Sequence, residues 1–237
     1  MPTPPGKALA TRVHPDERPR IKALNGMMTT LHGAPEQKGE LSYYSPILIQ
    51  CTLPHSDPKT ASWSKRNGNA ALVISSGFDR DGQPIGVPYG SLPRLALAYI
   101  ITRVIESGGE LEINLGAHFG SFLNEIGYVG NLRGTGRAAR TVQNQMYRLM
   151  KASINIEGRN GDDEQGGIVG ENIQIARRYA LWWDYKNPDQ GTLWGSYIKI
   201  SEGFRDEIIK APVPLRTDVL AALKKSPLAL DVYMWVS

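Results

Sequence analysis

The sequence has a single cysteine, Cys51, among its 237 residues, so it cannot form an intrachain disulfide. A lone cysteine is typical of a reducing compartment, and we expect a cytoplasmic location. Long apolar runs are also missing, because the longest, from Leu95 to Ile101, falls far short of the roughly 20 residues that span a bilayer. The N-terminus, Met-Pro-Thr-Pro-Pro-Gly, lacks the apolar core of a secretory signal. We therefore expect no contact with a membrane.

Groups of metal-binding or catalytic residues are scarce as well. The four histidines are far apart, and only one cysteine could join them: His14, His32, His55 and His118. No zinc spacing results, and no His-x-His pair is present to hold a metal beside a tyrosine nucleophile, as a nicking initiator or relaxase requires. The acidic run Asp162-Asp163-Glu164 lies in a glycine-rich loop, where a solvated turn is the simpler interpretation. We expect no metal site, no cofactor and no catalytic residue.

A glycine motif lies at the start of the helix expected over 137–151. Gly134-Thr-Gly136-Arg-Ala-Ala139 matches the G-x-G-x-x-A pattern of dinucleotide-binding turns. The motif needs a preceding strand and a βαβ unit, and neither is predicted here, so we interpret it as a turn that leads into a helix. A dinucleotide-binding enzyme is therefore the least favoured class.

The positive charge of the chain is concentrated in one short window. The whole sequence has 27 Lys and Arg against 23 Asp and Glu, a net charge of +4. Residues 129–159 carry +5, with Glu157 as their single acid, so the remaining chain is at −1. Such a concentration is typical of a surface that meets phosphate, although a solvated helix face is the simpler alternative for any one basic stretch.

The pattern of elements predicts the α+β class, with a winged helix-turn-helix domain that has a β-hairpin wing and an N-terminal extension. Residues 1–86 are predicted to be an arm and extension with short strands, at 41–53 and 72–74. Residues 87–212 show a helix after Ser91, an alternating strand at 110–115, a short helix up to Gly127, a glycine turn and a longer helix over 137–151. Hairpin strands follow between 153 and 200. Residues 213–237 are expected to begin a second helical or winged-helix module that is truncated.

The helix over 137–151 is the candidate recognition helix. At 100° per residue, Ala138, Val142, Met146 and Leu149 fall on one side. The opposite side has no acid and carries residue types that hold phosphates or read base edges in the major groove. The candidate DNA-binding residues on and around this helix are Arg133, Arg137, Arg140, Thr141, Asn144, Tyr147, Arg148, Lys151 and Arg159.

Some of these residues have a structural alternative. Arg148 and the neighbouring Gln145 are also suited to tying the helix to a nearby backbone carbonyl, and Tyr147 to packing beside the wing. Arg133 and Arg159 lie in turns, which favours phosphate contact over base reading. The strand aromatics are better suited to packing than to base stacking: Trp182, Trp183 and Trp194.

The last two thirds of the chain contain a series of distinctive blocks: Pro88-Tyr89-Gly90-Ser91-Leu92-Pro93-Arg94, Glu112-Ile-Asn-Leu-Gly116, Gln145-x-x-Arg148-Leu149, Leu181-Trp182-Trp183, Leu193-Trp194-x-Ser196, Ala211-Pro-Val-Pro214 and Ser226-Pro-Leu-Ala-Leu-Asp231-Val-Tyr233. In this order, the blocks resemble the RepA-type replication initiators of bacterial plasmids. The resemblance implies a non-catalytic initiator that binds double-stranded origin DNA, in particular repeated iterons. It also implies a homodimer, recruitment of the host initiator and replicative helicase, and repression of its own promoter.

Two other functions agree with the same features. A winged-helix transcriptional repressor would bind a promoter palindrome instead of origin repeats. A dimerisation module would expose the basic helix without reading DNA specifically.

Overall fold

The computed structural model of the chain describes residues 40–67, 70–127, 136–158, 169–182, 193 and 195–237. All of them belong to one unit, Gly39–Ser237. Within these residues, no helix combines the length and the apolar character needed to cross a membrane.

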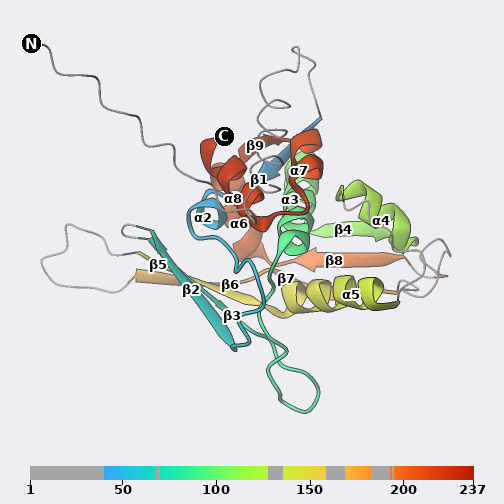
Figure 1. Cartoon of the computed structure of the whole chain (residues 1–237), viewed down its shortest axis with the longest axis horizontal. Helices are drawn as coiled ribbons and strands as arrows, with labels where there is room; N and C mark the ends of the chain where they lie inside the picture. The colour runs from blue at the N-terminus through green and yellow to red at the C-terminus, as the bar shows by residue number, and fades with distance from the viewer. Residues whose placement is uncertain (1–39, 68–69, 128–135, 159–168, 183–192, 194) are drawn as a thin grey trace, which may run out of the picture. The chain divides into compact units, whose positions relative to one another are not determined.

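Strands and helices are interspersed along the described residues (Figure 1). The strands are β1 (Leu41–Tyr44), β2 (Ser62–Asn67), β3 (Ala70–Ser75), β4 (Glu112–Gly116), β5 (Ser153–Gly158), β6 (Val169–Gln174), β7 (Ala176–Ala180), β8 (Ser196–Ile200) and β9 (Val213–Arg216). The helices are α2 (Pro46–Gln50), α3 (Ser91–Glu106), α4 (Phe119–Glu125), α5 (Gly136–Lys151), α6 (Glu202–Lys210), α7 (Thr217–Leu223) and α8 (Pro227–Val236).

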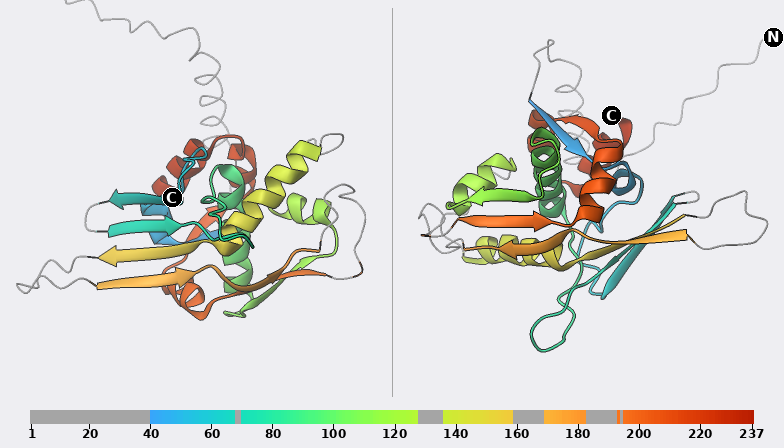
Figure 2. Two further views of the ribbon diagram at one scale, coloured as in Figure 1. Left: turned by 90° about the horizontal axis from the view of Figure 1, so that it is seen from below. Right: turned by 180° about the vertical axis from the view of Figure 1, so that it is seen from behind.

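The described strands form three sheets, in which every pair is antiparallel. Strand β1 pairs with β9, the second sheet has the order β2-β3-β5-β6, and the third has the order β4-β8-β7. Only Ile175, which is buried, separates β6 from β7, so one extended segment passes from the second sheet to the third (Figure 2). This mixed α and β structure with antiparallel sheets agrees with the predicted class.

Helix α3 is the central element of the core. Ten of its sixteen residues are buried, and they lie on all sides of the helix, as expected for a helix covered by neighbours all round. It contacts β1, β4, α5, α6 and α8. Segments before residue 87 and after residue 212 therefore pack on the same helix as the middle of the chain. The predicted division at these two boundaries stays a prediction.

Several elements lie where their patterns predicted them. Strand β4 buries Ile113 and Leu115 in alternation, and α4 buries Phe119, Phe122 and Leu123. Helix α8 begins after Ser226, whose side chain accepts a hydrogen bond from the Ala229 amide at 3.2 Å. These local patterns are strong because apolar spacing and capping chemistry agree in each of them.

Other expectations differ from the structure. The strand expected over 41–53 ends at Tyr44, and Pro46 begins α2, because a proline without an amide hydrogen fits the first turn of a helix. The helix expected after Ser91 already includes Ser91 as its first residue, and Gly90, at φ +82°, is the capping residue. The glycine turn at 130–136, the loop at 158–170 and the turn at 187–191 lie largely outside the described residues.

A buried ion pair joins α3 to α8. The Arg94 side chain is 2% exposed and donates to both Asp231 carboxylate oxygens, at 2.6 and 2.8 Å. Its remaining N–H groups donate to the carbonyls of Leu53, Pro54 and Gly90. All five donors of the guanidinium are thus used, and this satisfies a cation that burial would otherwise make costly.

Candidate nucleic-acid interface

Helix α5 has one buried side and one exposed side. Val142, Met146 and Leu149 are buried as predicted, and they pack toward α3. Met150 widens this apolar face. The high contrast between the two sides orients the helix, because rotating it would expose the apolar face and bury charged side chains.

The exposed side of α5 carries most of the predicted DNA-binding residues that the structure describes. Arg140, Thr141 and Asn144 are exposed, whereas Tyr147 and Lys151 are half-buried. The predicted contacts Arg133 and Arg159 lie outside the described residues, as does the side chain of Arg137, whose backbone belongs to the first turn of α5. Figure 2 (left), which views the unit from below, has α5 on the near side.

The Arg148 side chain makes three hydrogen bonds within the protein. Its Nη1 donates to the Asp57 carboxylate at 3.3 Å and to the Val87 carbonyl at 3.2 Å, and its Nε donates to the Asn144 Oδ1 at 3.0 Å. The guanidinium also lies over the Tyr89 ring, 5.4 Å from the ring centre, and the side chain is only 13% exposed. The structural alternative for Arg148, a tie to a neighbouring carbonyl, is therefore present, and most of its donors are used before any ligand binds.

Gln145 makes a second tie one turn earlier on the helix. This side chain is 3% exposed, and its Oε1 accepts the backbone N–H of Tyr89 at 2.9 Å. The tie is thus to an amide instead of the expected carbonyl. Together, Gln145 and Arg148 hold α5 against residues 86–89, a contact that the spacing of α5 alone did not reveal. The sequence signal for this contact was the pair of turn glycines, Gly86 and Gly90, both of which adopt a positive φ in the structure.

Lys151, at the end of α5, makes the third tie. Its Nζ donates to the Phe78 carbonyl at 2.6 Å and lies 4.9 Å from the centre of the Tyr147 ring. The hydrogen bond with Tyr147 raises the pKa of Lys151, which like any lysine is a cation at neutral pH. Lys151 therefore combines a structural contact with a positive charge on the exposed side of the helix.

Gly86 leaves room for the Arg148 guanidinium. A Cβ atom at this position would lie 2.7 Å from the Arg148 Nη1 and 2.8 Å from its Cζ, and φ is +85°. Gly82, at φ +74°, has no atom within 4 Å of the corresponding point. Both positions favour glycine by their backbone, but only one also has a steric reason.

Substituting these two glycines is expected to separate the two effects. Gly82→Ala should lower the free energy of unfolding by about 1–2 kcal/mol, the cost of a positive φ. Gly86→Ala should cost about 1–3 kcal/mol more, because the methyl group overlaps a guanidinium held by three partners. Urea unfolding of both variants measures the difference. Equal losses would mean that Arg148 moves aside freely and does not hold α5.

Catalytic chemistry finds little support among the described residues. No group of three or more His, Cys, Asp or Glu side chains in that part of the chain is placed so that it could hold a metal ion. Cys51 is fully buried, and burial raises the pKa of its thiol, which opposes thiolate formation. The chain thus presents no activated sulfur nucleophile.

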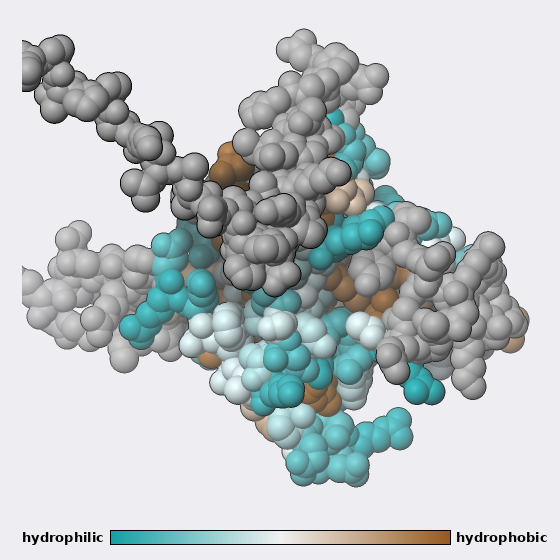
Figure 3. Space-filling view, in the orientation of Figure 1, coloured by the Kyte–Doolittle hydropathy of each residue, from teal (hydrophilic) through white to brown (hydrophobic). Residues whose placement is uncertain are grey.

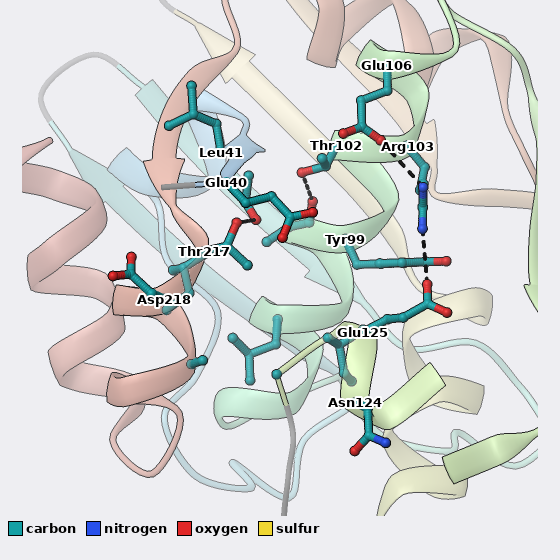
Figure 4. Close-up of a pocket in the computed structure, with 17 residues that line it drawn as sticks. Glu40, Leu41, Tyr99, Thr102, Arg103, Glu106, Asn124, Glu125, Thr217 and Asp218 are labelled. Carbon is teal, nitrogen blue, oxygen red and sulfur yellow. Dashed lines mark hydrogen bonds and ion pairs between the residues drawn. The ribbon is translucent and has the colours of Figure 1, made fainter. Parts of the chain in front are cut away.

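A cavity of about 500 Å³ lies between β1, α3, α4 and α7 (Figure 4). Arg103, near its rim, pairs with Glu125 at 3.1 Å and with Glu106 at 3.6 Å, and it lies over the Tyr99 ring. The described lining includes no histidine, cysteine or lysine. Its one lining arginine is already paired with carboxylates, which opposes the binding of an anion there.

Comparisons with known proteins give a family and a fold. Two solved structures of domains 2 and 3 of RctB resemble this chain at 11% sequence identity. One has a TM-score of 0.50 and covers 81% of this chain and 69% of its own, and the other has a TM-score of 0.43 with 69% and 58%. No curated protein matches the sequence.

A family model described as plasmid-encoded RepA protein matches residues 87–237. The matched region includes α3, α5 and the ties between α5 and residues 87–89. It amounts to well over half of the chain and supports a role in the initiation of plasmid replication. The chain therefore belongs to the family of plasmid-encoded RepA proteins.

Proposed function

We propose that this protein initiates plasmid replication by binding repeated iterons in double-stranded origin DNA, with α5 as the recognition helix of a winged helix-turn-helix. The observation that carries the proposal is the exposed side of α5, which presents cations and amides without an acid of its own. Side chains of these types bind phosphates and read base edges in the major groove. Membership in the RepA family makes origin DNA the expected target.

The order of elements supports this use of α5. Helix α3, strand β4 and helices α4 and α5 follow one another, and β4 joins β8 and β7 in one antiparallel sheet. A winged helix uses this order, with the third helix in the groove and a hairpin as the wing. In that scheme the β7–β8 hairpin is the wing, and β5 and β6 are an addition to the motif.

Each predicted residue has a proposed role. Arg140 and Asn144, in the middle of the exposed side, read bases, as Arg does for guanine and Asn for adenine. Arg148 supports this reading, because its Nε–H occupies one lone pair of the Asn144 Oδ1 and leaves the amide N–H groups for a base. The remaining residues bind phosphates: Arg133, Arg137, Thr141, Tyr147, Lys151 and Arg159.

Titration of origin repeats at several salt concentrations tests the proposal. We expect the protein to prefer the repeats over random duplex, with an affinity that falls steeply as salt rises, because each bound phosphate releases counterions. No preference, together with a flat dependence of log K on log salt, would overturn it. Footprinting separates the autorepressor alternative, since an inverted repeat at the promoter would be protected in place of direct repeats at the origin.

The family also leads us to propose that the protein forms a homodimer and recruits the host initiator and the replicative helicase in the bacterial cytoplasm. Analytical ultracentrifugation with and without origin DNA tests the first point, and co-purification with the two host proteins tests the second. A dimer that shifts no DNA would instead support the dimerisation-module alternative.

A further inference from the structure

Residues 77–86, here called the finger, form a closed turn between β3 and α3. The Asp79 N–H donates to the Gln83 carbonyl at 2.9 Å, and the Asp79 Oδ1 accepts the amides of Asp81 and Gln83 at 2.9 and 2.8 Å. Gly82, at φ +74°, completes the turn. The tip is thus held by backbone and carboxylate hydrogen bonds, so its shape is set before it meets a ligand.

The base of the finger is fixed to the end of α5. Ile85 donates to the Gly77 carbonyl at 3.0 Å, and Phe78 pairs with Pro84 as an isolated bridge. Lys151 holds the Phe78 carbonyl, and a Cβ atom on Gly77 would lie 2.4 Å from the Lys151 Cβ. The base of the finger is therefore held in a fixed position relative to α5, so the two elements would contact a ligand in one geometry.

The finger extends on the same side of the unit as α5. It lies below α5 in Figure 1, and in the view from below both are on the near side. The space-filling view shows it as a mostly hydrophilic projection (Figure 3). Arg80 and Gln83 are exposed at the tip, and Phe78, whose side chain is 58% exposed, has its backbone carbonyl held by Lys151 at the end of α5.

We propose that the finger is a second DNA-contacting element, in which Arg80 binds a backbone phosphate beyond the C-terminal end of α5 and Phe78 packs on the adjacent sugar. This inference rests on the proposed function, because it takes α5 as the helix that enters the groove. A pre-formed turn loses little entropy when it binds, which makes one arginine at its tip effective. Lys151 adds a positive charge at the base of the finger.

Two carboxylates flank Arg80 in the sequence, and both weaken its attraction for phosphate. Asp79 also caps two backbone amides, whereas Asp81 is exposed. Asp81 also keeps the finger from binding any anion tightly, so that contact depends on prior docking of α5. Its removal should thus strengthen binding, which gives the proposal a test in the opposite direction.

The test is a set of salt titrations with the full chain on origin repeats. Arg80→Ala is expected to weaken binding roughly fivefold and to lower the slope of log K against log salt by about 1, because one phosphate contact is lost. Phe78→Ala should weaken binding with the slope unchanged, since no charge is removed. Asp81→Asn should strengthen it. Lys225→Ala is the matched control, an exposed cation between α7 and α8, and it should behave as wild type.

The two proposals fail separately. If wild type binds repeats and Arg140→Ala loses that binding while Arg80→Ala and Phe78→Ala keep wild-type affinity and slope, the finger does not touch DNA and the function of α5 stands. If wild type shows no preference for repeats, the proposed function itself is wrong. If Arg80→Ala and Lys225→Ala lower the slope of log K against log salt by the same amount, Arg80 acts only through the net charge of the protein. The proposed phosphate contact would then be overturned.

Discussion

The Asp231→Ala substitution is expected to lower the free energy of unfolding by about 3–5 kcal/mol relative to wild type. This is the usual cost of leaving a buried charge without its partner. Arg94, 2% exposed, would keep its three carbonyl partners but lose both carboxylate contacts. His55, whose Nε2 lies 2.7 Å from the Asp231 Oδ2, would lose its partner as well. Since the pair connects α3 to α8, we expect the C-terminal helix to loosen first.

Urea unfolding measures this loss, and Asp218→Ala is its control. Asp218 makes the same kind of pair with Arg216, at 2.6 Å, but both side chains are well exposed. The pair with Arg216 lowers the pKa of the Asp218 carboxyl, yet solvent screens an exposed pair, so its loss should cost less than about 1 kcal/mol. Similar losses in both variants would contradict the structural role given to Asp231.

A double variant sharpens the same experiment. Arg94→Met combined with Asp231→Leu removes both charges, and apolar pairs often replace buried ion pairs without loss. Here the carbonyls of Leu53, Pro54 and Gly90 would lose the Arg94 N–H groups, although the Pro54 carbonyl would keep the Gly90 N–H, at 3.0 Å. We therefore expect only partial recovery relative to Asp231→Ala, because buried carbonyls without partners are themselves costly.

The sequence predicted those parts of the fold that short-range patterns determine. The faces of α5 follow from apolar spacing, and Val142, Met146 and Leu149 are buried as that spacing requires. The pairing of β1 with β9 joins residues about 170 positions apart, and the partner of Arg94 lies 137 positions away. No local pattern carries such pairings, since they depend on which surfaces the folded chain brings together.

The candidate interface shows the same limit. The residue types on α5 were sufficient to predict an exposed basic side, but they did not show which cations are already bound. Arg148 is taken up by Asp57, Val87 and Asn144, while Arg140 remains exposed. Asp57 lies 91 positions before Arg148 and stands in a loop without a recognisable motif. The roles of neighbouring arginines on one helix therefore differ for reasons that only tertiary contacts supply.

Because Arg140 and Asn144 remain exposed while Arg148 is bound, their substitution is expected to have a large effect on DNA binding. Arg140→Ala and Asn144→Ala are each expected to lower the free energy of binding to the preferred repeat by about 1–3 kcal/mol, and less on random duplex, because each removes a base contact. Arg140→Ala should also reduce the salt slope if its guanidinium spans a base and a phosphate. Competition titrations against single-base variants of the repeat would locate the base that each residue reads.

Gln143→Ala is the matched control on the same helix. Gln143 is exposed and polar, but it lies 60° from Arg140 and 100° from Asn144 at 100° per residue, at the edge of the exposed side. We expect its affinity to remain within about 0.5 kcal/mol of wild type, as for surface substitutions that remove no contact. If Gln143→Ala lost as much as Asn144→Ala, α5 would enter the groove in another rotation, with Tyr147 and Gln143 toward the bases and Arg148 turned away from them.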